Sequence, residues 1–85
     1  MKEETLIRDL SKLEKEIDRN HRYADCESDR DMKKQYLKDA ADLDKIANAI
    51  RGGDNKQAAR LIYDLDTLVR DQIPARLYNY VMKSF

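Results

Sequence analysis

His21 and Cys26 are the residues of this chain best suited to metal binding or to nucleophilic chemistry, and each is the sole residue of its type. A zinc site needs four ligands, so one built on this pair would have to be completed across chains by carboxylates. A catalytic thiol needs a base and an oxyanion hole, and neither is recognisable near Cys26. We interpret Cys26 as an inert thiol in a turn and expect no metal site.

Carboxylates alternate along residues 25–31, as the early ligands of a calcium loop do: Asp25, Glu27, Asp29 and Asp31. The sixth position of such a loop needs glycine for a sharp turn, and here it is Arg30. The twelfth position, normally a bidentate glutamate, is Tyr36. The pattern therefore indicates a solvated acidic turn.

Gly52 and Gly53 precede an expected helix start, and Lys56 follows them, which loosely resembles a phosphate-binding loop. The Walker spacing and the preceding strand are missing, and Asp54 would repel an anion. This favours a turn between two helices. Since no paired carboxylates in an apolar pocket and no cofactor motif are present either, we expect no enzyme and no cofactor.

The elements that carry these residues are organised around residues 32–51. On a helical projection, the apolar positions of this stretch fall within an arc of roughly 120°: Met32, Tyr36, Ala40, Leu43, Ile46, Ala47 and Ile50. The arc is wider than the seam of a simple coiled coil, so apolar helices can pack on both sides of it. We predict that residues 32–51 form the central helix of a small bundle.

The preceding segment predicts a second helix with a narrower seam. From Thr5 onward the apolar residues recur at three-to-four spacing: Leu6, Leu10, Leu13, Ile17 and Ala24. The seam is lost between Asp25 and Asp31, where Ser28 with Asp31 resembles a capping box, so we predict a turn and a helical hairpin. The alternative is one uninterrupted helix from Lys2 to Arg51, about 75 Å long at 1.5 Å per residue.

Two further helices are predicted after the glycine pair, the first beginning at Asp54 with Gln57. Its apolar positions fill an arc of roughly 140° up to Pro74: Ala58, Leu61, Ile62, Leu65, Leu68, Val69 and Ile73. A short last helix is expected from Ala75 to Phe85. The prediction for residues 1–85 is therefore a single all-α domain, a small bundle of three to four helices.

Composition limits the classes of partner. The chain has 85 residues, 40% of them charged, with 17 basic and 17 acidic side chains and therefore no net charge that attracts nucleic acid or an anionic membrane. So short a chain builds a thin core, which favours self-association or a partner. No apolar run suits a signal peptide or a membrane span, and the single cysteine fits a reducing compartment, so we expect a cytoplasmic location.

The last helix carries more apolar surface than one neighbour can cover, spread over roughly 200° of its circumference. We predict that aromatic residues here form the contact surface for a protein partner or a second copy: Tyr63, Tyr78, Tyr80, Val81 and Phe85. Asp39 falls inside the apolar arc of the central helix, so we predict a partner for its carboxylate: Asn20, His21 or a residue of a second chain.

These observations favour a small regulatory or inhibitory protein that acts by protein–protein binding, such as a bacterial adaptor or a phage-encoded inhibitor of a host factor. One alternative is a nucleic-acid- or nucleotide-binding modulator, because cations gather near the hairpin turn, although acidic residues are interleaved with them. A second alternative is a self-assembling structural helical protein. A membrane partner is not expected.

Overall fold

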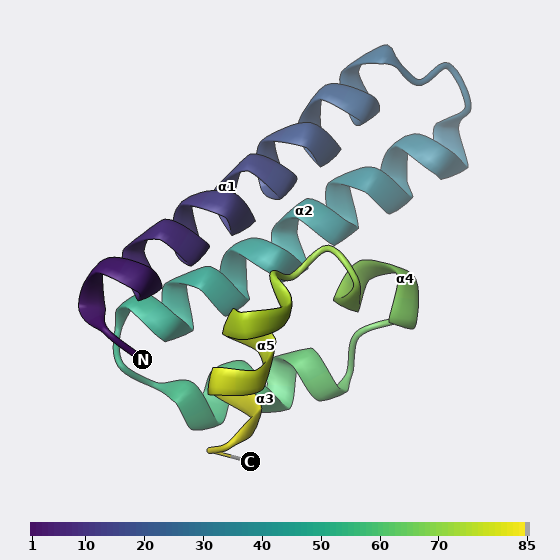
Figure 1. Ribbon diagram of the computed structural model, residues 1–85. Coiled ribbons are helices and arrows are strands. Elements are labelled where there is room, and N and C mark those ends of the chain that lie inside the picture. The colour runs from purple at the N-terminus through teal and green to yellow at the C-terminus, as the bar shows by residue number, and fades with distance from the viewer. Residues whose placement is uncertain (85) are drawn as a thin grey trace.

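The computed structural model describes residues 1–84, which form five helices and no strand. They are α1 (Glu3–Cys26), α2 (Arg30–Arg51), α3 (Asn55–Tyr63), α4 (Thr67–Arg70) and α5 (Ala75–Met82). Figure 1 shows α1 and α2 as a long antiparallel hairpin, with the three shorter helices beside one end of it. The predicted all-α fold, with a hairpin, a third helix and a short C-terminal helix, is confirmed. No helix of residues 1–84 is both long enough and apolar enough to cross a bilayer.

The hairpin turn lies where the apolar seam is lost, which excludes the single long helix. The capping residue differs from the prediction by one position, because α2 is capped by Asp29 and not by Ser28. Asp29 Oδ1 accepts hydrogen bonds from the backbone N–H groups of Asp31 at 2.9 Å and Met32 at 3.2 Å. A carboxylate at this position satisfies two otherwise unpaired donors and faces the positive end of the helix dipole.

The second turn follows the prediction. Gly53 adopts a φ of 78°, in the left-handed region that favours glycine. The next residue, Asp54, caps α3 by accepting a hydrogen bond from the backbone N–H of Gln57 at 3.1 Å. The chain thereby reverses over three residues and brings α3 against α2.

The prediction of one helix from Asp54 to Ile73 is wrong, because α3 ends at Tyr63 and a separate short helix, α4, follows. Asp66 is extended and its carboxylate accepts from the backbone N–H of Leu68, which starts α4 independently. The Arg70 guanidinium donates to the carbonyls of Tyr63 and Leu65 that the break leaves without helical partners. The break also shifts the helical phase, so Leu68, predicted to be in the core, is 77% exposed.

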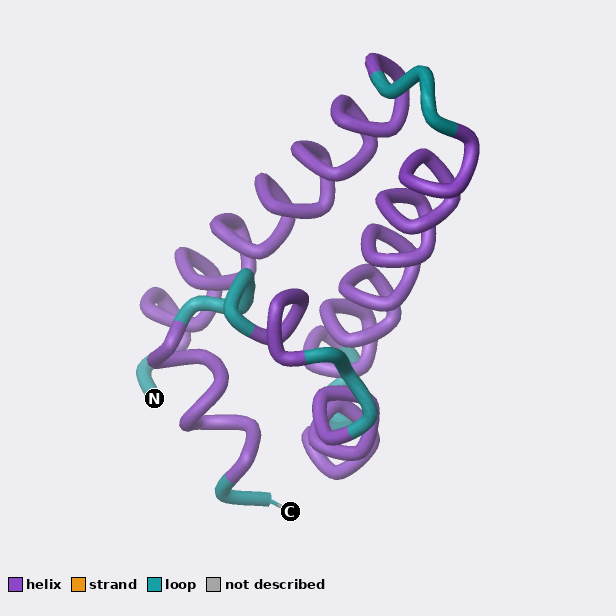
Figure 2. Tube along the Cα trace, turned by 90° about the vertical axis from the view of Figure 1, so that its right-hand side faces the viewer, coloured by secondary structure: helices purple, strands orange, loops and turns teal. Residues whose placement is uncertain are grey.

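The core occupies one end of the hairpin, where α3 and α5 pack against α2, α1 and each other. Its fully buried large side chains include Leu13, Leu43, Ile62, Leu77 and Val81. Figures 1 and 2 both show the other end of the hairpin projecting beyond α3, α4 and α5. We call residues 21–38 the hairpin tip and the covered end the base.

Candidate functional site

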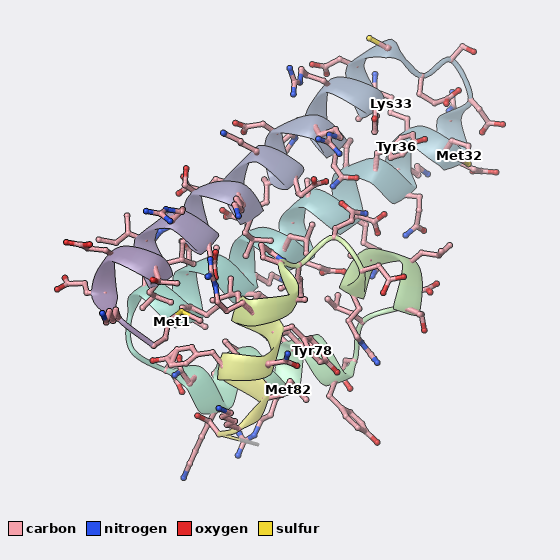
Figure 3. All side chains as sticks on the ribbon, in the orientation of Figure 1. Met1, Met32, Lys33, Tyr36, Tyr78 and Met82 are labelled. Carbon is pink, nitrogen blue, oxygen red and sulfur yellow. The ribbon has the colours of Figure 1, made fainter. Side chains whose placement is uncertain are left out.

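The hairpin tip carries a cluster of large side chains that no other helix covers. Tyr23 on α1 and Tyr36 on α2 lie with their ring centroids 5.4 Å apart, in a tilted arrangement. Met32 is one helical turn before Tyr36 on α2, and Figure 3 shows the two together near the turn. Tyr23 is 50% exposed and Met32 is 45% exposed. We call Tyr23, Met32 and Tyr36 the tip patch.

The tip patch extends the apolar stripe that builds the core. Met32 and Tyr36 belong to the same face of α2 as Ala40, Leu43 and Ala47, which are all fully buried. Within residues 21–38, however, Ala24 is the one buried residue. Met32, which the sequence places on the apolar face of the central helix, is therefore not part of the core, because α3 and α5 end before they reach this part of the hairpin.

A groove of about 670 Å³ runs between α1 and the segment that joins α4 to α5. Its lining on α1 includes Lys12, Lys15 and Arg19, and Arg76 at the start of α5 adds a fourth cation. Ile73 and Pro74 contribute apolar surface. Asp9, Glu16 and Asp71 also belong to the lining, so four cations and three carboxylates lie beside this apolar surface. We call this depression the α1–α5 groove.

Two polar contacts at this groove fix α5 and the segment before it against α1. Arg76 binds Asp9 through two hydrogen bonds, each 2.9 Å long, and Asp9 is 1% exposed. Nearer the tip, the Asn20 amide donates to Gln72 Oε1 at 2.7 Å. Both contacts join α1 to residues more than fifty positions further along the chain, and so hold the two walls of the groove together.

The Asp9 carboxylate is held in its charged form. The hydrogen bonds from Arg76 lower the pKa of Asp9, burial opposes this, and the positive charges of Arg76, Lys12 and Arg8 add to the lowering. Reciprocally, the hydrogen bond to Asp9 raises the pKa of Arg76. Two parallel hydrogen bonds between a carboxylate and one guanidinium fix the relative orientation of the two groups, so Asp9 anchors the N-terminal end of α5.

The basic residues of α1 share one exposed side of the helix. Their spacing of four, three, four and three residues keeps them within an arc of about 80°: Arg8, Lys12, Lys15, Arg19 and Arg22. The α1–α5 groove runs beside this row. In residues 1–84, Lys12 and Lys15 form no ion pair, whereas Arg19 lies 3.1 Å from Glu16.

The structure separates the residues predicted to form the partner surface. Tyr78 and Tyr80 are partly buried and lie two residues apart on α5, so they project about 160° apart on either side of the buried Leu77 and Val81. Tyr80 lines a second groove, of about 580 Å³, beside Lys2 and Lys83.

The other members of the predicted surface differ in their exposure. Val81 is fully buried in the core, and Figure 3 shows Tyr78 and Met82 on the body of α5. Tyr63 is 64% exposed at the end of α3, and Phe85 lies outside the described residues. The surplus apolar surface expected on the last helix is thus largely taken up by the core of the chain itself.

Asp39 finds its partner within its own helix. Gln35 Nε2 donates to Asp39 Oδ1 at 2.7 Å, so the predicted pairing with Asn20 or His21 is wrong, and Asn20 instead binds Gln72. Burial raises the pKa of Asp39 against the opposing effect of the Gln35 hydrogen bond and of Lys38, while Asp42 and Asp66 add to the increase. Among residues 1–84, Asp39 has no guanidinium partner comparable to that of Asp9.

The residues first considered for chemistry lie apart from these features. His21 and Cys26 are both exposed on α1. Within residues 1–84, no three His, Cys, Asp or Glu side chains are placed to hold a metal ion.

Sequence reasoning missed Asp9 and Tyr23, and it considered Asn20 only as a partner for Asp39. A signal for the roles of Asp9 and Asn20 existed, because both project beside the Leu13 position on α1, at the edge of the apolar seam, where a polar residue has to find a partner. Their partners, Arg76 and Gln72, lie more than fifty residues further along the chain and carried no local signal.

Comparisons with protein-family models, with curated proteins and with solved structures found no match to this chain.

Proposed function

We propose that this chain is a small regulatory or inhibitory protein that acts by binding another protein through the tip patch. The observation that carries the proposal is that the apolar face of α2 continues beyond the helices α3 and α5 that cover it. Met32 and Tyr36, on this uncovered part, lie beside Tyr23 at the projecting end of the hairpin. Tyrosine and methionine are enriched in the cores of protein interfaces.

The geometry of the tip favours binding at low entropic cost. Tyr23 and Tyr36 already contact each other across the hairpin, and both are anchored on long helices. Each can bury apolar surface against a partner without a change in backbone conformation, which reduces the ordering cost of association. Tyr63, the exposed member of the surface predicted from the sequence, lies on α3 and provides a matched comparison position.

Site-directed photo-crosslinking tests this proposal. The photoreactive amino acid p-benzoylphenylalanine replaces Met32, Tyr63 or the exposed Lys45 in separate variants, which are irradiated in lysate. We expect a discrete protein adduct from position 32 and none from position 45. Circular dichroism confirms that each variant keeps its helical content.

The other outcomes separate the remaining candidates. An adduct with the mass of two chains would favour the self-assembling structural protein, and a nuclease-sensitive adduct would favour the nucleic-acid modulator. An adduct from position 63 with none from position 32 would place the contact surface at Tyr63 and would overturn the tip patch.

A further inference from the structure

We infer that the α1–α5 groove and the basic row of α1 bind an extended acidic segment of the partner protein, an inference that rests on the proposed function. The groove supplies Lys12, Lys15 and Arg19 from one wall and Arg76 from the other. The groove also has three carboxylates: Asp9 is buried and bound to Arg76, Glu16 is paired with Arg19, and Asp71 is exposed on the wall formed by the segment between α4 and α5. Lys12 and Lys15 are exposed and form no ion pair in residues 1–84, so both ammonium groups are available to an incoming carboxylate.

The adjoining groove on the other side of Arg76 extends the cationic surface. Lys2 and Lys83 line it together with Arg76, and no carboxylate belongs to its lining. Positive charge therefore continues from Lys83 and Lys2 past Arg76 to the basic row on α1. A ligand in the α1–α5 groove meets cations at both of its ends.

The spacing of the basic row suits an extended peptide. Steps of three or four residues along a helix place successive cations about 4.5–6 Å apart along the axis. Alternate side chains of an extended peptide point to the same side and repeat at about 6.6 Å. From Arg8 to Arg22 the row is about 21 Å long, which matches about six extended residues with an acidic side chain at every second position.

The groove also leads to the tip patch. Arg19 and Tyr23 are one helical turn apart on α1, so a segment that leaves the groove at Arg19 reaches Tyr23 next. An acidic segment with an apolar residue at one end would thus occupy both surfaces.

A peptide fits this surface better than a nucleic acid does. Glu16 and Asp18 border the basic row on its two sides, where a duplex, broader than the row, would place its phosphates beside carboxylates. The chain has 17 basic and 17 acidic residues, so no overall field draws a polyanion toward it. The apolar surface of Ile73 and Pro74 suits a peptide that carries apolar as well as acidic side chains.

The test is an NMR titration of the full, ¹⁵N-labelled chain with defined probes. The first probe is a hexapeptide of alternating glutamate and serine, acetylated at its N-terminus and amidated at its C-terminus, and its control replaces each glutamate by glutamine. The third probe is tetrathymidylate, which carries the same three negative charges on phosphodiester groups. The expected result is that the acidic peptide shifts the amide signals of Lys12, Lys15, Arg19 and Arg76, that its glutamine control does not, and that tetrathymidylate binds more weakly.

Charge variants localise the effect. The double variant Lys12→Gln, Lys15→Gln is expected to bind the acidic peptide about tenfold more weakly, because each substitution removes a charge-assisted hydrogen bond to the peptide. Lys45→Gln with Lys56→Gln, which removes two exposed lysines on other helices, is the matched control and is expected to leave the affinity unchanged. All four positions are exposed, so we expect the variants to keep the fold.

Three results would overturn the inference: no shift with the acidic peptide, equal or tighter binding of tetrathymidylate, or equal loss of affinity in the two double variants. Its failure is separable from that of the proposed function. Crosslinking from position 32 together with no acidic-peptide binding would leave protein binding in place and remove the groove. Peptide binding at the groove with no adduct from position 32 would support the groove as an acidic-peptide site and remove the tip patch as the protein contact.

Discussion

The two ends of the hairpin are made of the same two helices and differ in what covers them. At the base, α3 and α5 complete the core, and Leu13, Leu43 and Leu77 are fully buried. At the tip, Met32 and Tyr36 continue the same stripe of α2 but have no third helix over them. Helical periodicity therefore identifies an apolar face, but whether that face becomes core or contact surface depends on whether another helix packs against it.

The largest expected effect on stability comes from shortening an apolar side chain of α2 at each end of the hairpin. Leu43→Ala leaves a cavity in the base and is expected to reduce the free energy of unfolding by about 2–5 kcal/mol. Met32→Ala, on the same stripe at the tip, is expected to change it by less than about 0.5 kcal/mol. Urea denaturation followed by circular dichroism measures both. Equal losses would mean that the tip is packed in solution.

The second comparison concerns the two buried aspartates. Asp9 at the base binds Arg76 through two hydrogen bonds, and Asp39 accepts one from Gln35. Asp9→Asn keeps the shape but removes the charge, so it is expected to cost about 1.5–3 kcal/mol of unfolding free energy. Asp18→Asn, at an exposed position of α1, is the control, with an expected change below about 0.5 kcal/mol. A similar result for both variants would contradict the anchoring role of Asp9.

Asp39→Asn is expected to have a smaller effect of opposite sign. The asparagine oxygen can still accept the hydrogen bond from Gln35, and the variant removes a buried charge that Asp42 and Asp66 disfavour. At neutral pH the unfolding free energy is therefore expected to rise by less than about 1 kcal/mol. A loss of stability at neutral pH would show that the charged form of Asp39 has a partner in solution.

The smallest expected difference between Asp9 and Asp39, and the most specific, is in how the stability of the chain depends on pH. The pKa of Asp9 is lowered, so its stabilising contribution is present above the ordinary aspartate value of about 3.9 and is lost as the pH falls through its folded-state pKa. The pKa of Asp39 is raised, so its contribution is present below that value and is lost as the pH rises through its folded-state pKa.

Denaturation profiles between about pH 2 and pH 7 measure both contributions. Asp9→Asn is expected to flatten the loss of stability in acid, and Asp39→Asn is expected to steepen it. The same change of slope in both variants would refute the assigned directions.

The sequence predicted the hairpin and its turn, the second turn at Gly52 and Gly53, and most core positions of α1 and α2, because these depend on local periodicity and capping. It did not predict the end of α3 at Tyr63, since the break depends on Asp66 capping α4 and on Arg70 reaching back to two carbonyls. The groove could not be foreseen either, because Asp9 and Arg76 meet only in the folded chain. The partner surface was sought at the aromatic terminus, where Val81 proves to be core.

The central claim is that the uncovered end of the α2 stripe binds a protein. Its most direct test is quantitative affinity capture from lysate with the original chain, with a Tyr23→Ser and Met32→Ser double variant, and with Tyr63→Ser as the exposed aromatic control. Urea denaturation first establishes that all three are equally stable. The account predicts that a specific captured protein falls by about tenfold or more with the tip variant and is retained with Tyr63→Ser. Retention of every captured protein by the tip variant, or loss with Tyr63→Ser instead, would contradict it.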